Sequence, residues 1–266
     1  MFIIDSHCHV YPQAIAAKAV KGVSDFYDGV KSYGDGLAST VKEHWKGYGV
    51  GHAVIFSVAT KLEQVDRINT FVSSTVSDGD GFFTGLGTVH QDVPDMAEAV
   101  DRIFSLGLKG VKLHPDTQGC ALDDPRLFPL YEACAGRIPV MLHTGDFRYD
   151  FSNPNRMEKV LKLFPKTTFI GAHFGGWSVW DEATRLLHCY DNLFVDSSST
   201  FHWVEPSKVK TYIRTYGSEK VMFGSDFPMW NVKPELDAML SLNLSDSEYE
   251  NIFHITAQRL FKIKDR

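Results

Sequence analysis

The sequence predicts an α/β protein of the (β/α)8-barrel class that forms one domain over residues 1–266. A length of 266 residues is close to the ~250 typical of one complete barrel of this class. Short β-branched or apolar runs recur about every 25–31 residues, and most of the stretches between them carry a helical apolar stripe. Eight strands that alternate with helices favour closure of a parallel sheet into a barrel.

The strands are expected where apolar runs end in turn residues, at 2–7, 52–58, 82–89, 109–114, 138–143, 168–173, 193–198 and 220–225. Runs such as Val140–Leu142 are apolar on both faces, as parallel strands covered by helices should be. The first crossover, from Tyr11 to Gly51, is long enough for two helices and a loop that could cover the barrel mouth. The stretch from Pro234 to Lys262 predicts two closing helices.

The composition is that of an ordinary soluble globular protein and favours a small-molecule partner. The net charge is -6, and no dense Lys/Arg run offers the electrostatic footprint that nucleic acid or anionic lipid needs. The N-terminus lacks a signal-peptide pattern and no long apolar run predicts a membrane span, so we expect a cytoplasmic protein. The four cysteines, which form no C-x-x-C pair, are expected to be reduced: Cys8, Cys120, Cys134 and Cys189. A homodimer is left open.

Histidines gather at the C-terminal ends of the expected strands, where a barrel of this class builds its active site. They are His7, His9, His114, His143 and His173, and Asp226 follows the eighth strand. His7 and His9 are two residues apart on an extended chain, so their side chains leave the same face and can converge on one ion. One H-x-H pattern is weak by itself, because strand-end histidines are often structural. The full set predicts a metal site.

Imidazole nitrogens suit zinc and its first-row neighbours, and a carboxylate such as Asp226 completes a site that keeps a position for water. A bound metal lowers the pKa of that water toward ~7, which makes a nucleophile at neutral pH. The remaining histidines have no ligand-like spacing and are expected to be structural: His44, His52, His90, His188, His202 and His254. No G-x-S-x-G, P-loop or G-x-G-x-x-G motif supports a serine hydrolase or a nucleotide-binding protein.

The strand-end motifs resemble those of the amidohydrolase superfamily, in the amidohydrolase-related branch that includes aminocarboxymuconate semialdehyde decarboxylase and the resorcylate decarboxylases. They are Asp5-Ser6-His7-Cys8-His9, Gly110-Val111-Lys112-Leu113-His114-Pro115, Leu142-His143-Thr144-Gly145, Gly171-Ala172-His173-Phe174-Gly175-Gly176 and Phe223-Gly224-Ser225-Asp226-Phe227-Pro228. The resemblance extends to the tail around Leu260. These motifs are specific for metal site and fold, and poorly specific for substrate.

The resemblance implies a role for each matched residue. His7, His9, His143 and Asp226 match the metal ligands, and Asp226 also matches the proton-transfer carboxylate. His173 matches a histidine that is a catalytic acid/base or substrate-polarising residue in this branch and a ligand in two-metal relatives. We therefore expect one zinc, or another divalent first-row ion.

A second ion stays open at the fourth strand. Lys112 occupies the position of the carboxylated lysine that bridges two metals in some relatives, so a second ion could be held by Lys112 with His143 and His173. Against this, His114 shares the face of Lys112, and a cationic Lys112 could instead pair with a carboxylate. One ion is favoured over two.

Four residues near the strand ends are predicted to bind substrate. His114 is one, and the planar fork of Arg148 suits a carboxylate or phosphate. Trp177 and Trp230 could wall an apolar or aromatic ligand, or could simply pack. The run from Asp196 to Ser198 could reach the pocket or cap the next helix.

Three functions follow from this site. The main expectation is a hydrolase in which metal-activated water attacks an amide, ester or lactone, with His173 polarising the carbonyl and Asp226 moving the proton. The alternative is non-oxidative decarboxylation of an aromatic or unsaturated carboxylic acid, with His173 or Asp226 delivering a proton to carbon. A non-catalytic metal-binding barrel is disfavoured, because no ligand or proton-transfer residue is missing.

Overall fold

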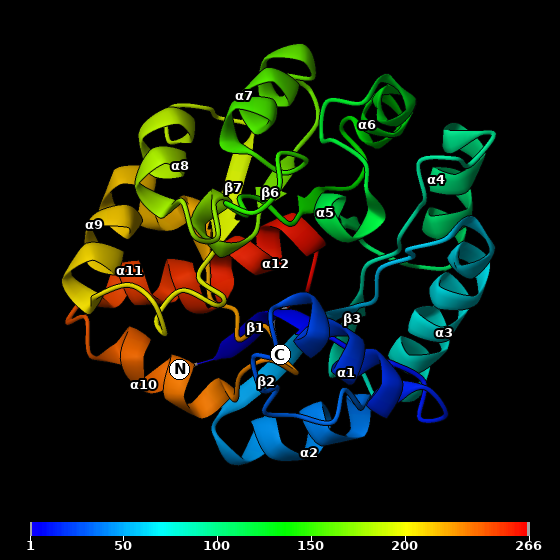
Figure 1. The fold of residues 1–266 in the computed structure, drawn as a ribbon. Coiled ribbons are helices and arrows are strands. Elements are labelled where there is room, and N and C mark those ends of the chain that lie inside the picture. Colours follow the sequence, from blue (N-terminus) through cyan, green and yellow to red (C-terminus); the bar gives the residue numbers. More distant parts are fainter. Residues whose placement is uncertain (1, 265–266) are drawn as a thin grey trace.

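The computed structural model describes residues 2–264, and within them eight parallel strands are surrounded by helices (Figure 1). The strands are β1 (Ile3–His9), β2 (Val50–Phe56), β3 (Phe83–Gly85), β4 (Val111–Leu113), β5 (Val140–Leu142), β6 (Phe169–Gly171), β7 (Leu193–Asp196) and β8 (Val221–Met222). Each overlaps its predicted range, and the barrel-class prediction is confirmed. Most strands are shorter than predicted, because the chain leaves the ladder just before the polar residues at the strand ends.

The strands form two hydrogen-bonded sheets, one in the order β1-β2-β3 and one in the order β4-β5-β6-β7-β8. Isolated bridges join the sheets at both seams, between Gly87 and Val111 and between Cys8 and Phe227. Backbone hydrogen bonds support each seam: Lys112 N donates to the Gly87 carbonyl at 2.7 Å, and His9 N donates to the Phe227 carbonyl at 2.6 Å. The first and last strands are thereby brought side by side.

The helices form an outer layer around the strands (Figure 1). They are α1 (Ala16–Phe26), α2 (Ala38–Gly47), α3 (Val65–Asp78), α4 (Met96–Ser105), α5 (Pro115–Gln118), α6 (Phe128–Cys134), α7 (Pro154–Leu163), α8 (Trp180–Leu187), α9 (Pro206–Tyr216), α10 (Val232–Leu240), α11 (Asp246–Glu250) and α12 (Thr256–Phe261). A π-helical turn, Asn251–Ile255, joins α11 to α12. The first of the two predicted closing helices is therefore α10. The second is the continuous stretch formed by α11, the π-helical turn and α12.

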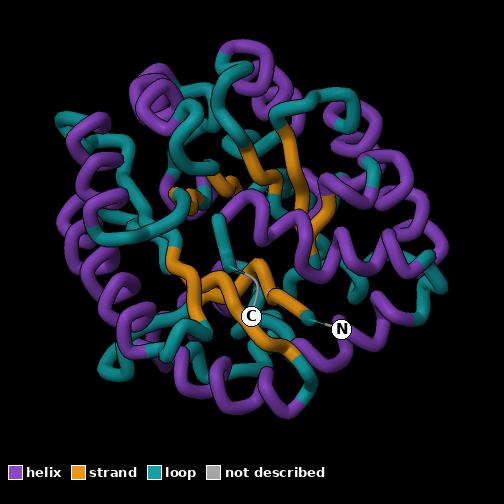
Figure 2. Tube along the Cα trace, turned by 180° about the vertical axis from the view of Figure 1, so that it is seen from behind, coloured by secondary structure: helices purple, strands orange, loops and turns teal. Residues whose placement is uncertain are grey.

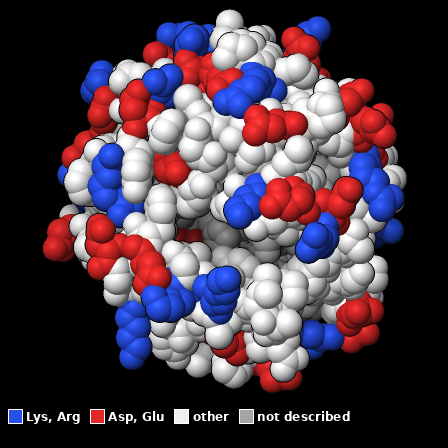
Figure 3. Space-filling model, turned by 45° about the vertical axis from the view of Figure 1, so that its right-hand side comes forward, with Lys and Arg blue, Asp and Glu red and all other residues white. Residues whose placement is uncertain are grey.

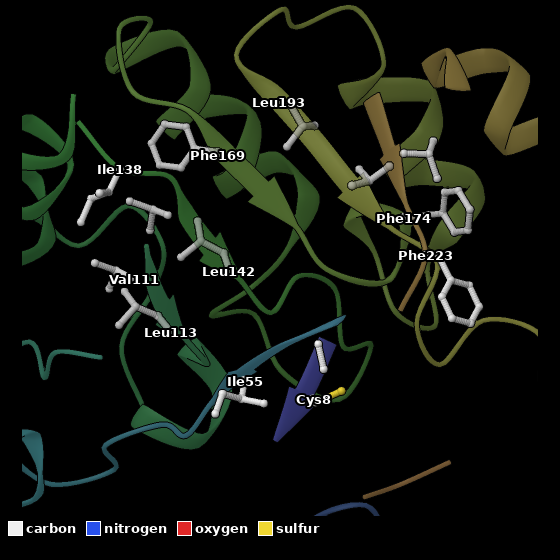
Figure 4. Packing of buried hydrophobic residues seen from close by; sticks show 14 of the residues in the cluster. Cys8, Ile55, Val111, Leu113, Ile138, Leu142, Phe169, Phe174, Leu193 and Phe223 are labelled. Carbon is white, nitrogen blue, oxygen red and sulfur yellow. The ribbon is translucent and has the colours of Figure 1, made fainter. Parts of the chain in front are cut away.

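The main apolar core lies between the strands and this helical layer. Val111, Leu142, Phe169 and Leu193 come from successive strands and are buried in one cluster (Figure 4). The register pairs Val111 with Val140, Val140 with Phe169, and Phe169 with Leu193, so these side chains share the outward face of the sheet. Burial of both sheet faces explains why the strand sequences are apolar throughout.

A second apolar cluster fills the inside of the barrel. Its members include Ile4, Val54, Met141, Ile170 and Met222, with Ala257 and Phe261 from α12. Seen from behind, the C-terminal helical stretch lies across the strands (Figure 2). Lys112 is in register with Met141 and is buried on this inner face, where Asp196 and Asp226 are the carboxylates that act on its charge.

The first crossover covers the barrel mouth, which is the end where the strands finish, as the sequence predicted. The segment after α1 packs on the β8 loop, with Tyr33 N donating to the Met229 carbonyl at 3.1 Å and Gly34 N donating to the Pro228 carbonyl at 2.8 Å. A side chain at Gly34 would collide with the Phe227 ring, so this close approach requires glycine.

The outer surface has no wide patch of one charge sign on the face shown in Figure 3, where basic and acidic side chains are interspersed. The exposed ion pairs join neighbouring opposite charges, as between Arg137 and Asp101 at 2.6 Å. None of the helices in residues 2–264 combines the length and the apolar character needed to cross a bilayer.

Asp5 ties the seam between β1 and β8 together. It is fully buried and accepts hydrogen bonds from Ser225 N at 2.9 Å, from Ser225 Oγ at 2.6 Å and from Trp45 Nε1 of α2 at 2.6 Å. Burial raises the pKa of this carboxyl, and the Ser225 and Trp45 hydrogen bonds oppose that rise. One side chain thus connects the first strand, the last strand and a covering helix.

Asp5→Ala is expected to lower the free energy of unfolding by at least about 3 kcal/mol, because the donors Ser225 N, Ser225 Oγ and Trp45 Nε1, and also His7 N, lose their acceptor at ~1–3 kcal/mol each. Urea denaturation measures this loss. Asp101→Ala, at the exposed pair with Arg137, is the matched control and should leave the midpoint close to that of the wild type. A loss below about 1 kcal/mol for Asp5→Ala would contradict the proposed role of the seam.

Candidate metal and active site

Three of the predicted ligands meet where β1 ends and β8 is followed by its loop. His7 Nε2 lies 3.3 Å from His9 Nε2 and 3.3 Å from Asp226 Oδ1, and His9 Nε2 lies 3.5 Å from the same oxygen. The backbone supports this approach, because Asp226 N donates to the His7 carbonyl at 2.9 Å. Three ligand atoms of the types that bind first-row metal ions therefore face one point.

The second nitrogen of His7 is held by a buried carboxylate. His7 Nδ1 donates to Asp196 Oδ2 at 2.9 Å, and both side chains are fully buried. An ionised carboxylate only accepts, so the hydrogen of His7 is on Nδ1 and the lone pair is on Nε2, toward His9 and Asp226. Asp196 on β7 thus orients a predicted ligand, as carboxylates behind metal-bound histidines commonly do. The sequence had left open whether Asp196 reaches the pocket.

His173 and His143 lie next to this group. His173 Nδ1 is 3.0 Å from the Ser198 carbonyl, which can only accept, so the hydrogen is on Nδ1. His173 Nε2 therefore carries the lone pair and receives His143 Nδ1–H at 3.1 Å. The Nε2 lone pair of His143 is left buried without a hydrogen-bond partner among the described residues.

His143 is not brought into the group of His7, His9 and Asp226. Its Nε2 faces Asp116 Oδ2 at 3.8 Å, and its ring stacks on His114 with centroids 3.9 Å apart and planes 8° from parallel. Imidazole lone pairs lie in the ring plane, so these two parallel rings cannot direct both lone pairs to one ion. The role of His143 as fourth ligand stays a prediction, and it requires rotation of this side chain.

Lys112 is buried beside His7, with Nζ 3.4 Å from His7 Nε2 and 5.1 Å from the centre of the Phe56 ring. Burial lowers the pKa of Lys112 to about 8, against the opposing effect of Asp196 and Asp226. No carboxylate oxygen among residues 2–264 lies within 4.0 Å of Nζ. The second metal position predicted at Lys112 and His173 stays a prediction.

The electrostatics of the site favour a cation. Burial lowers the pKa of His7 and of His9 well below the ordinary value, and it lowers the pKa of His173 to about 3. These imidazoles are therefore neutral and carry lone pairs at physiological pH. Burial also raises the pKa of Asp226 to about 7, with the Ser199 hydrogen bond opposing the rise. Neutral nitrogens and one poorly solvated carboxylate fit a divalent first-row ion.

Backbone strain is concentrated at the same place. His173, Ser199 and Asp226 follow β6, β7 and β8 and have positive φ values of 59°, 51° and 63°. Each such residue costs on the order of 1–3 kcal/mol and persists only where the surrounding structure holds it, as at active sites. The strain turns these side chains from the strand ends into the barrel mouth.

Arg148, predicted to bind substrate, is engaged by the protein. It pairs with Asp146 through Nη2 at 2.7 Å and Nε at 2.9 Å, with Asp28 at 3.1 Å, and donates to the Phe26 carbonyl at 2.8 Å. The guanidinium also lies over the Tyr27 ring, 5.1 Å from its centre. In this arrangement Arg148 holds the end of α1 over the mouth.

Tyr27 lies at the barrel mouth beside two predicted substrate residues, and the sequence analysis did not single it out. Its hydroxyl is 3.0 Å from His114 Nε2, and its ring lies 5.2 Å from that of Trp177 in an edge arrangement. His114, Trp177 and Tyr27 thus line one wall of the mouth, which agrees with two of the predicted substrate residues but does not test them. The Gly-, Tyr- and Asp-rich composition of the first crossover was the available signal.

Trp230 directs its polar edge to Ser199. Its Nε1 donates to Ser199 Oγ at 2.8 Å, and its ring stacks on His202 at 3.6 Å. Ser199 was also missed, although it follows directly on the run from Asp196 to Ser198 that was considered. The strand-end position alone could not show which of these residues turns inward.

A strained parallel barrel with histidines and a carboxylate at its strand ends is the arrangement of a metal-dependent barrel enzyme. The sequence profile of the amidohydrolase family matches residues 4–263. The chain belongs to the amidohydrolase family, which confirms the resemblance seen in its motifs.

One curated relative matches a short part of the chain. It is the 2-amino-3-carboxymuconate-6-semialdehyde decarboxylase of Dictyostelium discoideum, 32% identical over 75 residues, which cover 27% of this chain. The match spans only 21% of the relative's own length. This similarity supports the branch of the family, and it leaves the activity of the whole protein to be proposed.

Solved structures share the fold along nearly the whole chain. An uncharacterised TIM-barrel protein of Bordetella bronchiseptica has a TM-score of 0.81 at 20% identity, covering 98% of this chain and 99% of its own. The 5-carboxyvanillate decarboxylase of Sphingomonas paucimobilis has a TM-score of 0.75 at 16% identity, with coverage of 98% and 99%. The dihydroxybenzoic acid decarboxylase of Polaromonas, solved with bound manganese and 2-nitroresorcinol, has a TM-score of 0.76 at 15% identity, with coverage of 99% and 98%. These likenesses show the fold.

Arg148→Met is expected to loosen the cover, because the end of α1 loses its ion pair with Asp28 and the hydrogen bond to the Phe26 carbonyl. Amide hydrogen exchange, followed by mass spectrometry, should speed up at residues 26–28. Arg156→Met is the matched control, since Arg156 also pairs with two aspartates but lies on α7. Unchanged exchange in Arg148→Met, together with a raised KM, would favour the predicted substrate contact instead.

Proposed function

We propose that this protein is a metal-dependent, non-oxidative decarboxylase of a small aromatic or unsaturated carboxylic acid. The observation that carries the proposal is the neutral His173 imidazole, whose ring centre lies 5.1 Å from that of His7 and whose Nε2 accepts the hydrogen bond from His143 Nδ1. The decarboxylases named above share the fold and act on carboxylic acids of this class. They favour decarboxylation over hydrolysis, which was the main expectation from the sequence.

The ion would be held by His7, His9 and Asp226, with His143 as a fourth ligand after its ring turns away from Asp116. A divalent ion at this position binds substrate oxygens and stabilises the negative charge that develops on them. Zinc was expected from the ligand types, and manganese is bound in several structural relatives. We therefore propose a divalent first-row ion and leave its identity to measurement.

His173 would move the proton. The Ser198 carbonyl holds the Nδ1 hydrogen, so Nε2 is the atom that takes up a proton and delivers it. Turning His143 toward the ion would also release His173 Nε2 from its present hydrogen bond. In the reaction the bond between the substrate carbon and its carboxylate breaks, the electron pair stays on that carbon, and carbon dioxide leaves. His173 Nε2, which carries only a lone pair in this structure, would first take up a proton from water, and the carbon would then receive that proton.

The wall of Tyr27, Trp177 and His114 would orient a flat substrate. Aromatic side chains offer apolar area with a defined face, and the Tyr27 hydroxyl and His114 add polar groups at its edge. The cover formed by the end of α1 would keep water from the reacting carbon, which favours protonation by a positioned side chain. Homodimer formation and the predicted cytoplasmic location have no part in this proposal.

Product analysis tests the proposed reaction. Purified protein loaded with manganese or with zinc is incubated with 5-carboxyvanillate, with dihydroxybenzoates and with 2-amino-3-carboxymuconate-6-semialdehyde in water labelled with 18O. We expect release of carbon dioxide and no 18O in the organic product. Incorporation of 18O into an organic product from an ester or lactone panel, without carbon dioxide release, would favour the hydrolase.

Two variants separate metal binding from proton transfer. His173→Ala is expected to keep its metal and to slow the chemical step by about 10²–10⁴-fold, the usual effect of losing a positioned proton donor. The double change of His7→Ala and His9→Ala should lose the metal while the protein stays folded. Elemental analysis and single-turnover kinetics measure both. Loss of one of two bound ions in His173→Ala would show instead that this residue is a ligand.

A further inference from the structure

The two oxygens of the Asp226 carboxylate have different surroundings. Oδ1 faces the predicted metal position, 3.3 Å from His7 Nε2 and 3.5 Å from His9 Nε2. Oδ2 points the other way and accepts a hydrogen bond from Ser199 Oγ at 2.5 Å. A carboxylate that is free to rotate would exchange these two oxygens. Something therefore has to define which one faces the ion.

Ser199 receives one hydrogen bond and donates another, and the chemistry of its partners sets the direction. Trp230 Nε1 is 2.8 Å from Ser199 Oγ, and an indole nitrogen can only donate. One lone pair of Ser199 Oγ therefore accepts from Trp230, and the single hydroxyl hydrogen is donated to Asp226 Oδ2. Ser199 is 4% exposed and has a φ of 51°, a conformation that serine rarely adopts. The strained backbone aims Oγ at Asp226.

The Trp230 indole is itself fixed from behind. It stacks on His202, with ring centroids 3.6 Å apart and planes 22° from parallel. His202 Nε2 lies 2.8 Å from Oε1 of Glu235, which is buried on α10. Contacts from the β7 loop, the β8 loop and α10 thus hold the donor edge of Trp230 on Ser199. An indole that served only as a substrate wall would not need its N–H committed in this way.

We infer that Ser199 and Trp230 are positioning residues that orient the Asp226 carboxylate, so that Oδ1 is the oxygen presented to the metal ion. This inference rests on the proposed role of Asp226 as a ligand. It changes the role expected for Trp230, which acts through Ser199 and not by direct contact with substrate. Hydrogen bonds behind a ligand typically change metal affinity by about 10–100-fold.

The test measures metal affinity by competition with a chelator, with manganese alone and with zinc alone as probes. Trp230→Phe keeps an aromatic ring against His202 and removes only the N–H donor. Ser199→Ala removes the hydroxyl. We expect Ser199→Ala to weaken metal binding by about 10–100-fold and Trp230→Phe to weaken it by a smaller factor. Trp203→Phe is the control, because Trp203 lies on the β7 loop with Ser199 and its side chain is more than half exposed. The metal affinity of this variant should be unchanged.

A double-mutant cycle distinguishes positioning from general loosening of the loop. Because Trp230 acts through Ser199, Trp230→Phe should have no further effect on metal affinity in a Ser199→Ala protein. Effects that multiply, or single variants within twofold of the wild type, would overturn the inference. If one variant does not fold by circular dichroism, the other still reports the affinity change.

Failure of the proposed function can be distinguished from failure of this inference. A wild-type protein that binds the metal but releases no carbon dioxide would remove the proposed reaction and leave the affinity test of Ser199 and Trp230 intact. A wild-type protein that binds neither ion would overturn Asp226 as a ligand, and this inference with it.

Discussion

The His7 imidazole lies between two carboxylates that come from different strands, and the rest of the site is arranged around it. Asp196 of β7 holds its Nδ1 hydrogen, while Asp226, which follows β8, faces its Nε2 lone pair. This is possible only because β1 is brought next to the β8 end of the sheet. The seam fastened by Asp5, Ser225 and Trp45 is therefore a condition for the site as well as for the fold.

Burial has opposite effects on the two kinds of group in this site, and both effects favour a cation. It keeps the imidazoles neutral, which leaves their lone pairs available, and it makes the Asp226 carboxylate poorly solvated. A buried negative group with few partners gains much from a nearby positive ion. The buried Lys112 ammonium is then the group least easily reconciled with a bound metal, which is why its charge state matters for the number of ions.

The mouth of the barrel is built from segments far apart in the sequence. The end of α1 supplies Tyr27, which meets His114 and Trp177, while Arg148 fastens this segment through Asp28 and the Phe26 carbonyl. Arginine that is already paired on two sides contributes little free charge to a ligand. In the proposed reaction the ion and the histidines, and not this guanidinium, would meet the substrate carboxylate.

The barrel class, the strand positions and the residues at the strand ends could be read from the sequence, because strand periodicity and strand-end chemistry are local properties of the chain. His7 and His9 share a face for the same reason, since two residues along a strand always do. The approach of Asp226 to this pair was predictable from the class of barrel, in which first and last strands are neighbours.

Only the tertiary structure decided how the side chains turn. The sequence could not show that His143 stacks on His114 or that Arg148 forms ion pairs with Asp146 and Asp28. Nor could it show that Trp230 donates a hydrogen bond to Ser199. These outcomes depend on side-chain torsions and on donors and acceptors supplied by distant loops, and several involve residues at positive φ. Sequence spacing determines which residues reach the mouth, and competition among buried polar groups for partners determines what each of them does there.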